Sequence, residues 1–300
     1  MAGDLSIREE PDALVVRAGN AELARYVFEP DAPTEESPKP FFHPLRTLTG
    51  APLTVYRPWD HRWHKGLSMT WSEVSGENFW GGPTFSRDAG YQWRDNLGSM
   101  RHERFRSVER AGAAVSFLEE LSWHSSTGER WVAETRSHRF SVDANRALWV
   151  LDFTTELVNV RGSELVFGSP TTLGRENAGY TGLFWRGPRS WTSGAVRSST
   201  GSSPDDVMGS EAEWVSFSGE HDELDGGATV IAYAGTSSAA VPIKWFVRAE
   251  PFAALAPSPS FDEAIAVPEG GALRLQHRFV FIDLRLDGEE LRAIAGELRP

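Results

Sequence analysis

The residues best suited to chemistry lie close together in the segment 59–80. Asp60, His61, His64 and Lys65 fall within six residues, and an aromatic block follows shortly after them. Imidazoles titrate near neutral pH, so each histidine could act as an acid, a base or a metal ligand. Tryptophans beside them offer flat apolar faces to a ring-shaped ligand. We therefore expect part of an active site in this segment.

Two kinds of chemistry are open to the histidine pair. As a site for a divalent metal, His61 and His64 would need a further ligand such as His102 or Glu134. Residues three apart on a regular strand point to opposite faces, so both imidazoles can reach one ion only if the segment is a loop. As acid–base machinery, one imidazole has to reach the substrate while Asp60 fixes its tautomer. An ordinary hydrogen-bonded loop is the third interpretation.

Two strand-like runs carry further titratable groups. Alternation places His102 and Arg104 on one face of the first run, where they would line a pocket or form a ladder of ion pairs. In the second run Glu134, Arg136 and His138 share one face, which implies either solvent or a polar cleft there. His102 and Glu134 are therefore candidates for the group that complements the histidine pair.

A glycine-rich segment, 168–189, reads as a turning loop rather than a strand. Its glycines do not match a phosphate-binding loop, because no Gly-Lys-Ser/Thr ending is present. Its longer side chains could hydrogen-bond hydroxyls or a carboxylate and stack on a ring. The candidates for these roles are Arg175, Asn177, Tyr180, Trp185 and Arg186.

Twelve tryptophans are many for 300 residues, and their faces suit sugar rings, so the composition favours a carbohydrate ligand. Trp71 and Trp131 alternate with apolar neighbours and are expected in the core. The candidates for exposure are Trp59, Trp63, Trp80, Trp93, Trp185 and Trp245. Asp60, Lys65, Asn96 and Arg248 complete the predicted substrate-binding set.

Composition argues against several classes of function. The formal net charge of −12 disfavours nucleic acid and anionic membranes as partners, since both attract clustered Lys and Arg. The absence of cysteine excludes disulfides, thiolate zinc sites and cysteine nucleophiles. No segment approaches the roughly 20 apolar residues of a membrane-spanning helix, and the N-terminus has no basic start before an apolar stretch. We expect a cytoplasmic protein, monomeric or homo-oligomeric, that binds a small carbohydrate without a cofactor.

The elements that must position these residues are strands. Apolar side chains alternate with polar ones in many runs separated by turn residues. The runs are 14–17, 23–28, 41–48, 53–56, 67–72, 100–108, 114–124, 130–142, 147–160, 214–217, 228–233, 243–248 and 272–284. The run 67–72 should have one core face and one polar face, with the histidine segment at its mouth.

Few other elements are predicted. Turns are expected at Gly112, Gly128 and Asn145, and the segment 197–211 has no apolar periodicity, which indicates a mobile loop. Only 287–298 predicts a helix, with its apolar residues on one face. So much strand with so little helix implies an all-β fold in which two large antiparallel sheets pack face to face, as one domain over residues 1–300.

Three blocks of the sequence resemble the bacterial PmoA-like family, whose members are largely uncharacterised. They are 40–46, 60–67 with the pattern Asp-His-x-x-His-Lys-Gly, and 76–80 with the pattern Gly-x-x-Phe-Trp. Later blocks at 214–219, 243–248 and 251–252 also look like that family. The family's label implies a methane oxygenase subunit, which is an integral membrane protein, whereas this sequence has no spanning segment.

The resemblance implies a fold similar to the galactose mutarotase-like supersandwich. In such folds a histidine and a carboxylate act as acid and base at a sugar ring. Carried over by position, Asp60, His61, His64 and Lys65 match the hallmark block, and Arg175-Glu176 lies where many relatives have a Lys-Glu pair. The resemblance thus points to an epimerase, lyase or hydrolase of sugars, with a non-catalytic sugar-binding module as the alternative.

Overall fold

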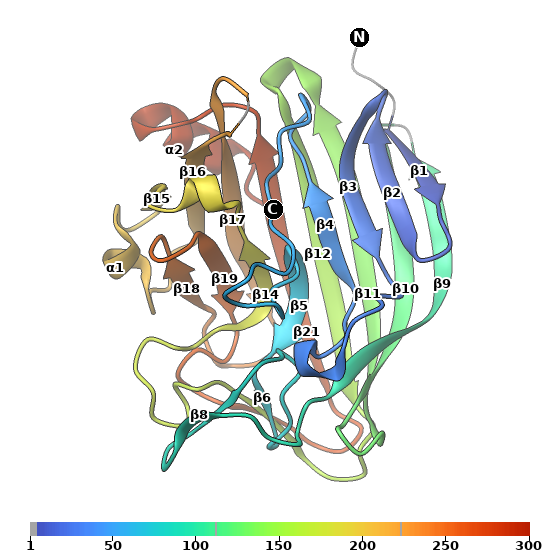
Figure 1. Cartoon of the computed structure of the whole chain (residues 1–300). Helices are drawn as coiled ribbons and strands as arrows, with labels where there is room; N and C mark the ends of the chain where they lie inside the picture. The colour runs from blue at the N-terminus through green and yellow to red at the C-terminus, as the bar shows by residue number, and fades with distance from the viewer. Residues whose placement is uncertain (1–4, 112, 223) are drawn as a thin grey trace.

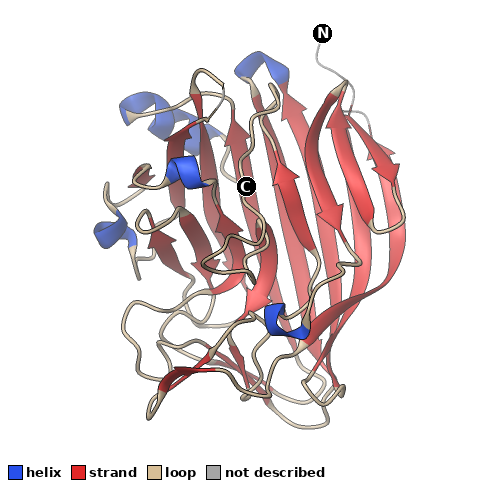
Figure 2. Ribbon diagram, in the orientation of Figure 1, coloured by secondary structure: helices blue, strands red, loops and turns tan. Residues whose placement is uncertain are grey.

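The computed structural model of the chain describes residues 5–111, 113–222 and 224–300. Two large sheets of antiparallel strands face each other and form a sandwich (Figures 1 and 2). The all-β, two-sheet architecture predicted from the alternating runs is therefore confirmed. The turn expected at Gly112 lies outside the described residues.

The first sheet has eight strands and combines segments that are far apart in the sequence. In spatial order they are β1 (Leu5–Glu9), β2 (Ala13–Ala18), β3 (Ala21–Val27), β4 (Phe41–Leu45), β5 (Leu67–Trp71), β14 (Thr181–Arg186), β19 (Ala254–Ser258) and β18 (Lys244–Arg248). Because β5 and β14 pair, the histidine segment just before β5 lies beside the end of β14.

The second sheet also has eight strands, and its four longest neighbours form a continuous meander. In spatial order they are β15 (Ala195–Ser198), β16 (Trp214–Glu220), β17 (Gly227–Ser237), β21 (Ala272–Ile282), β12 (Leu148–Asn159), β11 (Arg130–Asp143), β10 (Ala114–His124) and β9 (Ser99–Ala111). The expected turns at Gly128 and Asn145 are present, with Gly128 at φ +83° and Asn145 in a 3-10 turn.

The smaller elements gather mainly at one end of the sandwich, where Figure 1 shows β6 and β8 among long loops. They are β6 (Glu73–Val74), β13 (Leu165–Gly168) and β20 (Ile265–Val267) in one sheet, and β7 (Thr84–Ser86) and β8 (Gly90–Gln92) in another. The helical elements are η1 (Thr34–Glu36), η2 (Ala144–Arg146), η3 (Arg189–Trp191), α1 (Pro204–Val207) and α2 (Gly288–Glu297).

Three apolar clusters hold these layers together. The largest fills the space between the two sheets and includes Trp71 and Trp131, both as predicted. A second lies on the outer face of the second sheet, where α2 packs through Leu291 and Ala295, which confirms the predicted helix. A third lies on the outer face of the first sheet and is rich in aromatic side chains. This third cluster carries the candidate site.

Three expectations about elements are wrong. Residues 53–56 form no strand, and their one isolated bridge joins Tyr56 to Lys65. The segment 197–211, expected as a loop, includes the end of β15 and the short helix α1, which packs against β15 and β18. The segment 168–189 includes β14, which is buried on both faces and therefore lacks the alternation of a half-buried strand.

The strand β5 also differs from its expected two-faced character. All five of its residues are buried, including the polar Ser68 and Thr70. Its polar face is covered by the loop that contains Phe79, whose carbonyl accepts a hydrogen bond from Thr70 at 2.9 Å. Loops therefore cover the outer face of the first sheet at this point.

Candidate functional site

Two consecutive turns carry the histidine pair. The N–H of His61 donates to the carbonyl of Pro58 at 3.0 Å, and the N–H of His64 donates to the carbonyl of His61 at 3.0 Å. A turn brings residues i and i+3 close together, so both imidazoles point to the same side. Their rings stack with centroids 4.7 Å apart and planes 21° apart. The loop geometry that the sequence left open is the one found.

Gly66 ends this loop where it enters β5. Its φ is +69°, and a Cβ there would lie 2.3 Å from the carbonyl oxygen of Phe42. Its own carbonyl accepts the N–H of Arg186 at 2.7 Å. Only glycine combines this backbone conformation with so close an approach of a neighbouring strand.

A partly buried ion cluster fixes the loop from behind. Glu36 accepts hydrogen bonds from Arg57, with one Nη2–Oε1 distance of 2.7 Å, and forms an ion pair with Lys65. Burial alone would raise the pKa of Glu36, but the hydrogen bonds and charges of these two cations hold it below its usual value. Lys65 was predicted to bind substrate. It is instead buried, with its ammonium group committed to Glu36.

The neighbours of each imidazole determine its tautomer. His61 Nδ1 lies 3.0 Å from Asp60 Oδ2, so the ionised carboxylate accepts its hydrogen and Nε2 keeps a free lone pair. His64 Nδ1 lies 2.9 Å from Arg186 Nη1. A guanidinium only donates, so His64 accepts at Nδ1 and carries its hydrogen on Nε2. The two stacked rings therefore have opposite hydrogen-bonding character at Nε2.

Electrostatics keep both imidazoles neutral. Burial lowers the pKa of His61, although the hydrogen bond and charge of Asp60 oppose this shift. Burial and the charge of Arg186 lower the pKa of His64 further. For Asp60, burial is outweighed by hydrogen bonds from His61 and Arg186, so its pKa lies below the usual value. Asp60 also pairs with Arg189.

Alternation along β14 and β18 builds the floor beneath the histidines. On β14, Phe184 and Arg186 face outward while Trp185 enters the core. On β18, Phe246 faces outward while Trp245 enters the core. Trp185 and Trp245 are fully buried, so the expectation that they face a ligand is wrong.

Two aromatic residues form walls above this floor. Trp63 packs on the turn at Gly81 and Gly82, where a Cβ at Gly82 would lie 2.5 Å from its indole ring. Trp80 is buried, and its ring centroid lies 5.7 Å from that of His64 and 4.6 Å from that of Tyr180. Trp80 thus connects the histidine end of the site to the region around Tyr180.

These elements enclose a cavity of about 400 Å³, which we call the site pocket. It brings together seven residues predicted for catalysis or binding: His61, Trp63, His64, Trp80, Arg175, Tyr180 and Arg248. Its other lining residues are Gly81, Pro83, Tyr91, Phe184, Phe246, Pro251 and Phe252. Asp60 and Arg186 support the pocket through the two histidines, and the Arg186 guanidinium lies 3.6 Å from the Phe252 ring centroid.

Cationic and phenolic groups lie around Tyr180. Arg175 donates to the hydroxyl of Tyr91, and its guanidinium lies 4.6 Å from the centroid of that ring. The hydroxyls of Tyr91 and Tyr180 are 2.6 Å apart. Arg248 extends over Phe246 with 5.4 Å between guanidinium carbon and ring centroid. This part of the pocket is therefore rich in hydrogen-bond donors.

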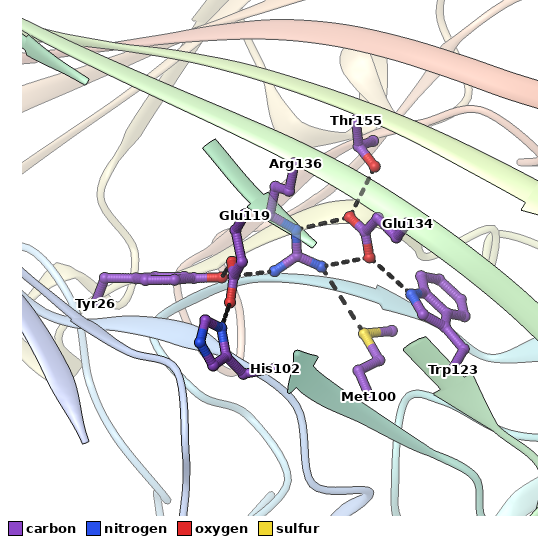
Figure 3. A network of polar contacts seen from close by, with 8 residues as sticks. All are labelled: Tyr26, Met100, His102, Glu119, Trp123, Glu134, Arg136 and Thr155. Carbon is purple, nitrogen blue, oxygen red and sulfur yellow. Dashed lines mark hydrogen bonds and ion pairs between the residues drawn. The ribbon is translucent and has the colours of Figure 1, made fainter. Parts of the chain in front are cut away.

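His102 and Glu134 lie elsewhere, in a polar network between the two sheets (Figure 3). Glu134 accepts from Arg136 through Nε at 2.7 Å and Nη2 at 2.9 Å, and also from Trp123 and Thr155. Its face is neither solvent nor a cleft, because the opposite sheet covers it. The prediction that these two residues complement the histidine pair has no geometric support.

The same network links His102 to a second carboxylate. His102 Nδ1 lies 2.7 Å from Glu119 Oε1, and Tyr26 donates to Glu119 while accepting from Arg136 at 3.0 Å. Burial raises the pKa of Glu119, against the hydrogen bond from His102. Figure 3 shows these contacts continuing from His102, Glu119 and Tyr26 through Arg136 to Glu134.

Three other predicted residues do not line the site pocket. Glu176 and Asn177 are exposed in the loop before β14, with Asn177 at φ +52°. Asn96 braces a turn by donating to the carbonyl of Gly76 at 2.7 Å. Their positions in two polar loops suggested these residues, and neither loop brings them into the lining of the pocket.

Three larger hollows lie on the surface that the described residues form. One of about 770 Å³ lies beside β17 and the segment 239–243, and one of about 570 Å³ lies beside His102 and Thr34. The third, of about 530 Å³, borders Arg248 together with Asp205 and Glu250, and its described lining holds no histidine. The first is bordered by carboxylates such as Glu211 and Glu213, but its histidine, His277, is buried and donates to the carbonyl of Ala234. The second borders a single histidine whose carboxylate partner is fully buried. The chemistry therefore favours the smaller site pocket.

Several contributors were not predicted. Tyr91 lies on the short hairpin β7–β8, and Phe184 and Phe252 lie next to residues that were considered. The two-residue repeat of strand geometry would have placed Phe184 and Arg186 on one face, had 181–186 been taken as a strand. Arg189 and Glu36 act across long sequence separations that no local pattern indicates.

A metal site is not apparent in the described residues. Within 5–111, 113–222 and 224–300, no group of three or more His, Asp or Glu side chains is close enough to hold an ion. The Nδ1 atoms of His61 and His64 are already committed to Asp60 and Arg186.

None of the helices in the described part of the chain is long and apolar enough to cross a membrane.

Solved structures of sugar enzymes are similar to this chain at low scores. The alpha-galactosidase AgaB of Geobacillus stearothermophilus has a TM-score of 0.44 and 10% identity over 93% of this chain, which spans only 41% of that protein. A putative aldose 1-epimerase of Escherichia coli K12 has a TM-score of 0.38 and 10% identity over 93% of this chain and 98% of its own. A galactose 1-epimerase of Lactobacillus acidophilus has a TM-score of 0.35 and 7% identity over 93% of this chain and 97% of its own. None of these similarities assigns an activity to this chain.

Sequence comparison is more specific. No curated protein matches the chain. The resemblance to the PmoA-like family stays a prediction, because the family model that matches carries a different description. That model matches residues 13–296, and the protein therefore belongs to the family of unknown function DUF6807.

Proposed function

We propose that the protein is a carbohydrate-active enzyme that moves a proton on a sugar derivative bound in the site pocket, with His61 as general base. The observation that carries the proposal is the opposite hydrogen-bonding character of the stacked imidazoles. Asp60 leaves His61 Nε2 free to accept a proton, and Arg186 leaves His64 Nε2 as a donor. A base beside a hydrogen-bond donor suits abstraction of a proton from a substrate in which the negative charge left behind moves onto a neighbouring oxygen.

The walls of the pocket favour a sugar ring. Trp63, Trp80 and Phe252 present aromatic surface beside the histidines, and such surface packs against the C–H face of a ring. The cavity of about 400 Å³ is suited to one small molecule. The mixture of apolar walls with a few polar groups is typical of small-molecule sites.

The lining also favours one class of reaction. Glycoside hydrolysis ordinarily uses two carboxyl groups that flank the scissile bond. Of the described residues that line the pocket, none is Asp or Glu, and Asp60 reaches it only through His61. Epimerisation or elimination, each of which requires proton transfer, therefore fits the site better than hydrolysis.

The experiment is a ligand screen followed by an assay of turnover. Neutral sugars, sugar acids and keto-sugars are tested by thermal shift, because a ligand at 100 times its dissociation constant adds about 2.7 kcal/mol of stability. Each ligand that binds is then incubated with the protein, and NMR follows product formation. We expect His61→Gln to lower the rate about 10²–10⁴-fold without loss of folding.

His124→Gln is the control, because His124 lies on β10 away from the site pocket and should leave the rate unchanged. An unchanged rate in His61→Gln would reject the assignment of the base. Saturable binding with no product from any ligand would identify a sugar-binding module instead of an enzyme.

A further inference from the structure

Arg175 and Arg248 give the site pocket a local charge opposite to that of the whole chain. The chain carries a formal net charge of −12, yet the pocket lining holds these two arginines and, among the described residues, no carboxylate. Both arginines are partly buried, and the removal of a charge from water is costly unless an opposite charge pairs with it. The lining without a carboxylate therefore suits an acidic group on a ligand.

The contacts of the two arginines support this view. Within the described part of the chain, neither Arg175 nor Arg248 forms a salt bridge with Asp or Glu. Arg175 donates to the hydroxyl of Tyr91, and Arg248 lies over Phe246. In contrast, Arg186 at the other end of the pocket pairs with Asp60.

The two guanidinium groups also repel each other. Burial and, next, the positive charge of Arg175 lower the pKa of Arg248. Like charges held close together in a half-buried site destabilise it unless an anion lies between or beside them. A bound oxyanion would remove this repulsion.

The paired hydroxyls add a neutral donor. Tyr91 accepts from Arg175, and its hydroxyl lies 2.6 Å from that of Tyr180. Two hydroxyls carry two hydrogens, and the bond between them uses one, so the other is free to donate. Burial raises the pKa of Tyr180, so its hydroxyl stays protonated.

We propose that Arg175 and Arg248, with the Tyr91–Tyr180 hydroxyl pair, form an oxyanion subsite that binds the carboxylate or phosphate of an acidic sugar derivative. This inference rests on the proposed function in assigning the rest of the ligand to a sugar. The bridge between the two ends is Trp80, which contacts His64 and Tyr180. An anionic group held at the arginines would orient the sugar ring along Trp80 toward His61.

Isothermal titration calorimetry of the folded full-length chain tests the subsite. The ligands are D-glucuronate, D-glucose 6-phosphate and D-glucose, with inorganic phosphate and acetate as probes that do not depend on sugar stereochemistry. We expect at least one anion to bind and to bind more weakly as salt is raised. Arg175→Gln and Arg248→Gln should each weaken that binding about tenfold or more, and Arg248→Lys should restore part of it.

Arg62→Gln is the matched control. Arg62 lies exposed in the histidine loop and outside the pocket lining, so its replacement removes the same charge without touching the subsite. Equal weakening by Arg62→Gln would reduce the effect to overall charge and overturn the proposal. Binding of none of the anions would overturn it as well.

The outcomes separate this inference from the proposed function. If anions bind in an arginine-dependent way but no sugar is turned over, the subsite stands and the enzymatic proposal fails. If D-glucose binds as well as D-glucuronate and D-glucose 6-phosphate, or if Arg248→Gln weakens all three equally, the subsite fails while sugar chemistry remains open. Preference for D-glucuronate with acetate identifies a carboxylate, and preference for D-glucose 6-phosphate with inorganic phosphate identifies a phosphate.

Discussion

His61 and His64 have the same side chain but different hydrogen-bonding character, because their neighbours differ. The carboxylate of Asp60 orients His61 with an accepting Nε2, and the guanidinium of Arg186 orients His64 with a donating Nε2. His61 is also the more accessible, with 35% of its side chain exposed, while the whole residue His64 is 4% exposed. This difference supports the proposed roles of His61 in proton transfer and of His64 in stabilising a developing negative charge.

This assignment predicts the acid side of the pH–rate profile. A base must be unprotonated, so the rate should fall as pH falls through the pKa of His61, which burial lowers from its usual 6.5. Asp60 opposes that shift, so Asp60→Asn should move the decrease in rate to still lower pH. It should also reduce the maximal rate, because His61 would no longer be held in the tautomer with a free Nε2. The measurement is kcat/KM against pH for both proteins. An identical midpoint in Asp60→Asn would contradict the assignment, and Asp88→Asn at an exposed position serves as the control.

The network in Figure 3 yields a prediction about stability rather than catalysis. Glu134→Gln leaves the buried guanidinium of Arg136 without its ion-pair partner, which should cost about 3–5 kcal/mol of unfolding free energy. Glu120→Gln is the control, since Glu120 lies on the outer face of β10 and pairs only with surface arginines. Urea unfolding of the two variants gives the comparison. Equal stability of both variants would show that the network contributes little.

Single residues were predictable from the sequence only where chemistry was concentrated. The spacing of His61 and His64 indicated a site, and the loop needed to bring them together was identified as a condition. His102 and Glu134 were misplaced because strand alternation gives the face of a side chain but not what covers that face. Glu134 shares its face with Arg136 as predicted, yet the opposite sheet buries both.

Among the elements, the loop from Arg57 to Gly66 matters most, because its turns set the position of both imidazoles. It is held at Gly66 by the carbonyl that accepts the N–H of Arg186, and from behind by Glu36. Lys39 supports the facing turn by donating to the carbonyls of Glu36, Ser37 and Trp80 at 2.8 to 3.0 Å. The loop is therefore fixed on both sides before a ligand arrives.

Gly66→Ala tests the importance of this anchor. The new Cβ would collide with the carbonyl of Phe42 in addition to occupying a left-handed backbone conformation. Gly270→Ala is the matched control, since Gly270 has the same φ of +69° with open space around it. The control should lose about 1–2 kcal/mol, and Gly66→Ala should lose more and also lose ligand binding. Equal losses in urea unfolding would mean that the close approach is unimportant.

Element prediction succeeded where alternation was long and clear. The runs 114–124 and 130–142 correspond closely to β10 and β11, and 287–298 corresponds to α2. It failed for β14, whose glycine and uninterrupted apolar residues resemble a turn next to a core segment. A strand buried on both faces has no alternation to detect, so its identity depends on neighbours that only the folded chain supplies.

For the molecule as a whole, the sandwich brings four distant segments to one pocket. Residues 61–64, 80–91, 175–184 and 246–252 meet because β5, β14, β19 and β18 lie side by side in the first sheet. The strand order 5-14-19-18 cannot be read from sequence patterns, since those patterns locate strands without pairing them. The sequence therefore predicted residues of the pocket in separate segments, without indicating that these segments meet at one pocket.

The buried histidines predict how the stability of the whole molecule depends on pH. Burial lowers the pKa of His277 to about 4 and, together with the charge of Arg46, that of His43 to about 4. Between about 6.5 and 4 the unfolded chain binds protons at these residues that the folded chain does not, so stability should decrease as pH falls through this range. Glu119, with its raised pKa, contributes a slope of the opposite sign.

Urea unfolding at several pH values measures this dependence. Replacement of His277 by Gln should reduce the slope of unfolding free energy against pH by up to about 1.4 kcal/mol per pH unit within that range. The comparison of slopes is independent of any constant loss of stability that the substitution causes. An unchanged slope would mean that His277 titrates alike in the folded and unfolded chains.

We propose that a sugar derivative binds and reacts in the site pocket beside His61. The most direct measurement is a crystal structure of the protein with the tightest ligand from the screen. We predict that the sugar ring lies against Trp80. The carbon or hydroxyl oxygen that loses its proton should lie about 2.6–3.2 Å from His61 Nε2. Ligand density in the hollow beside His102, with the site pocket empty, would contradict the claim.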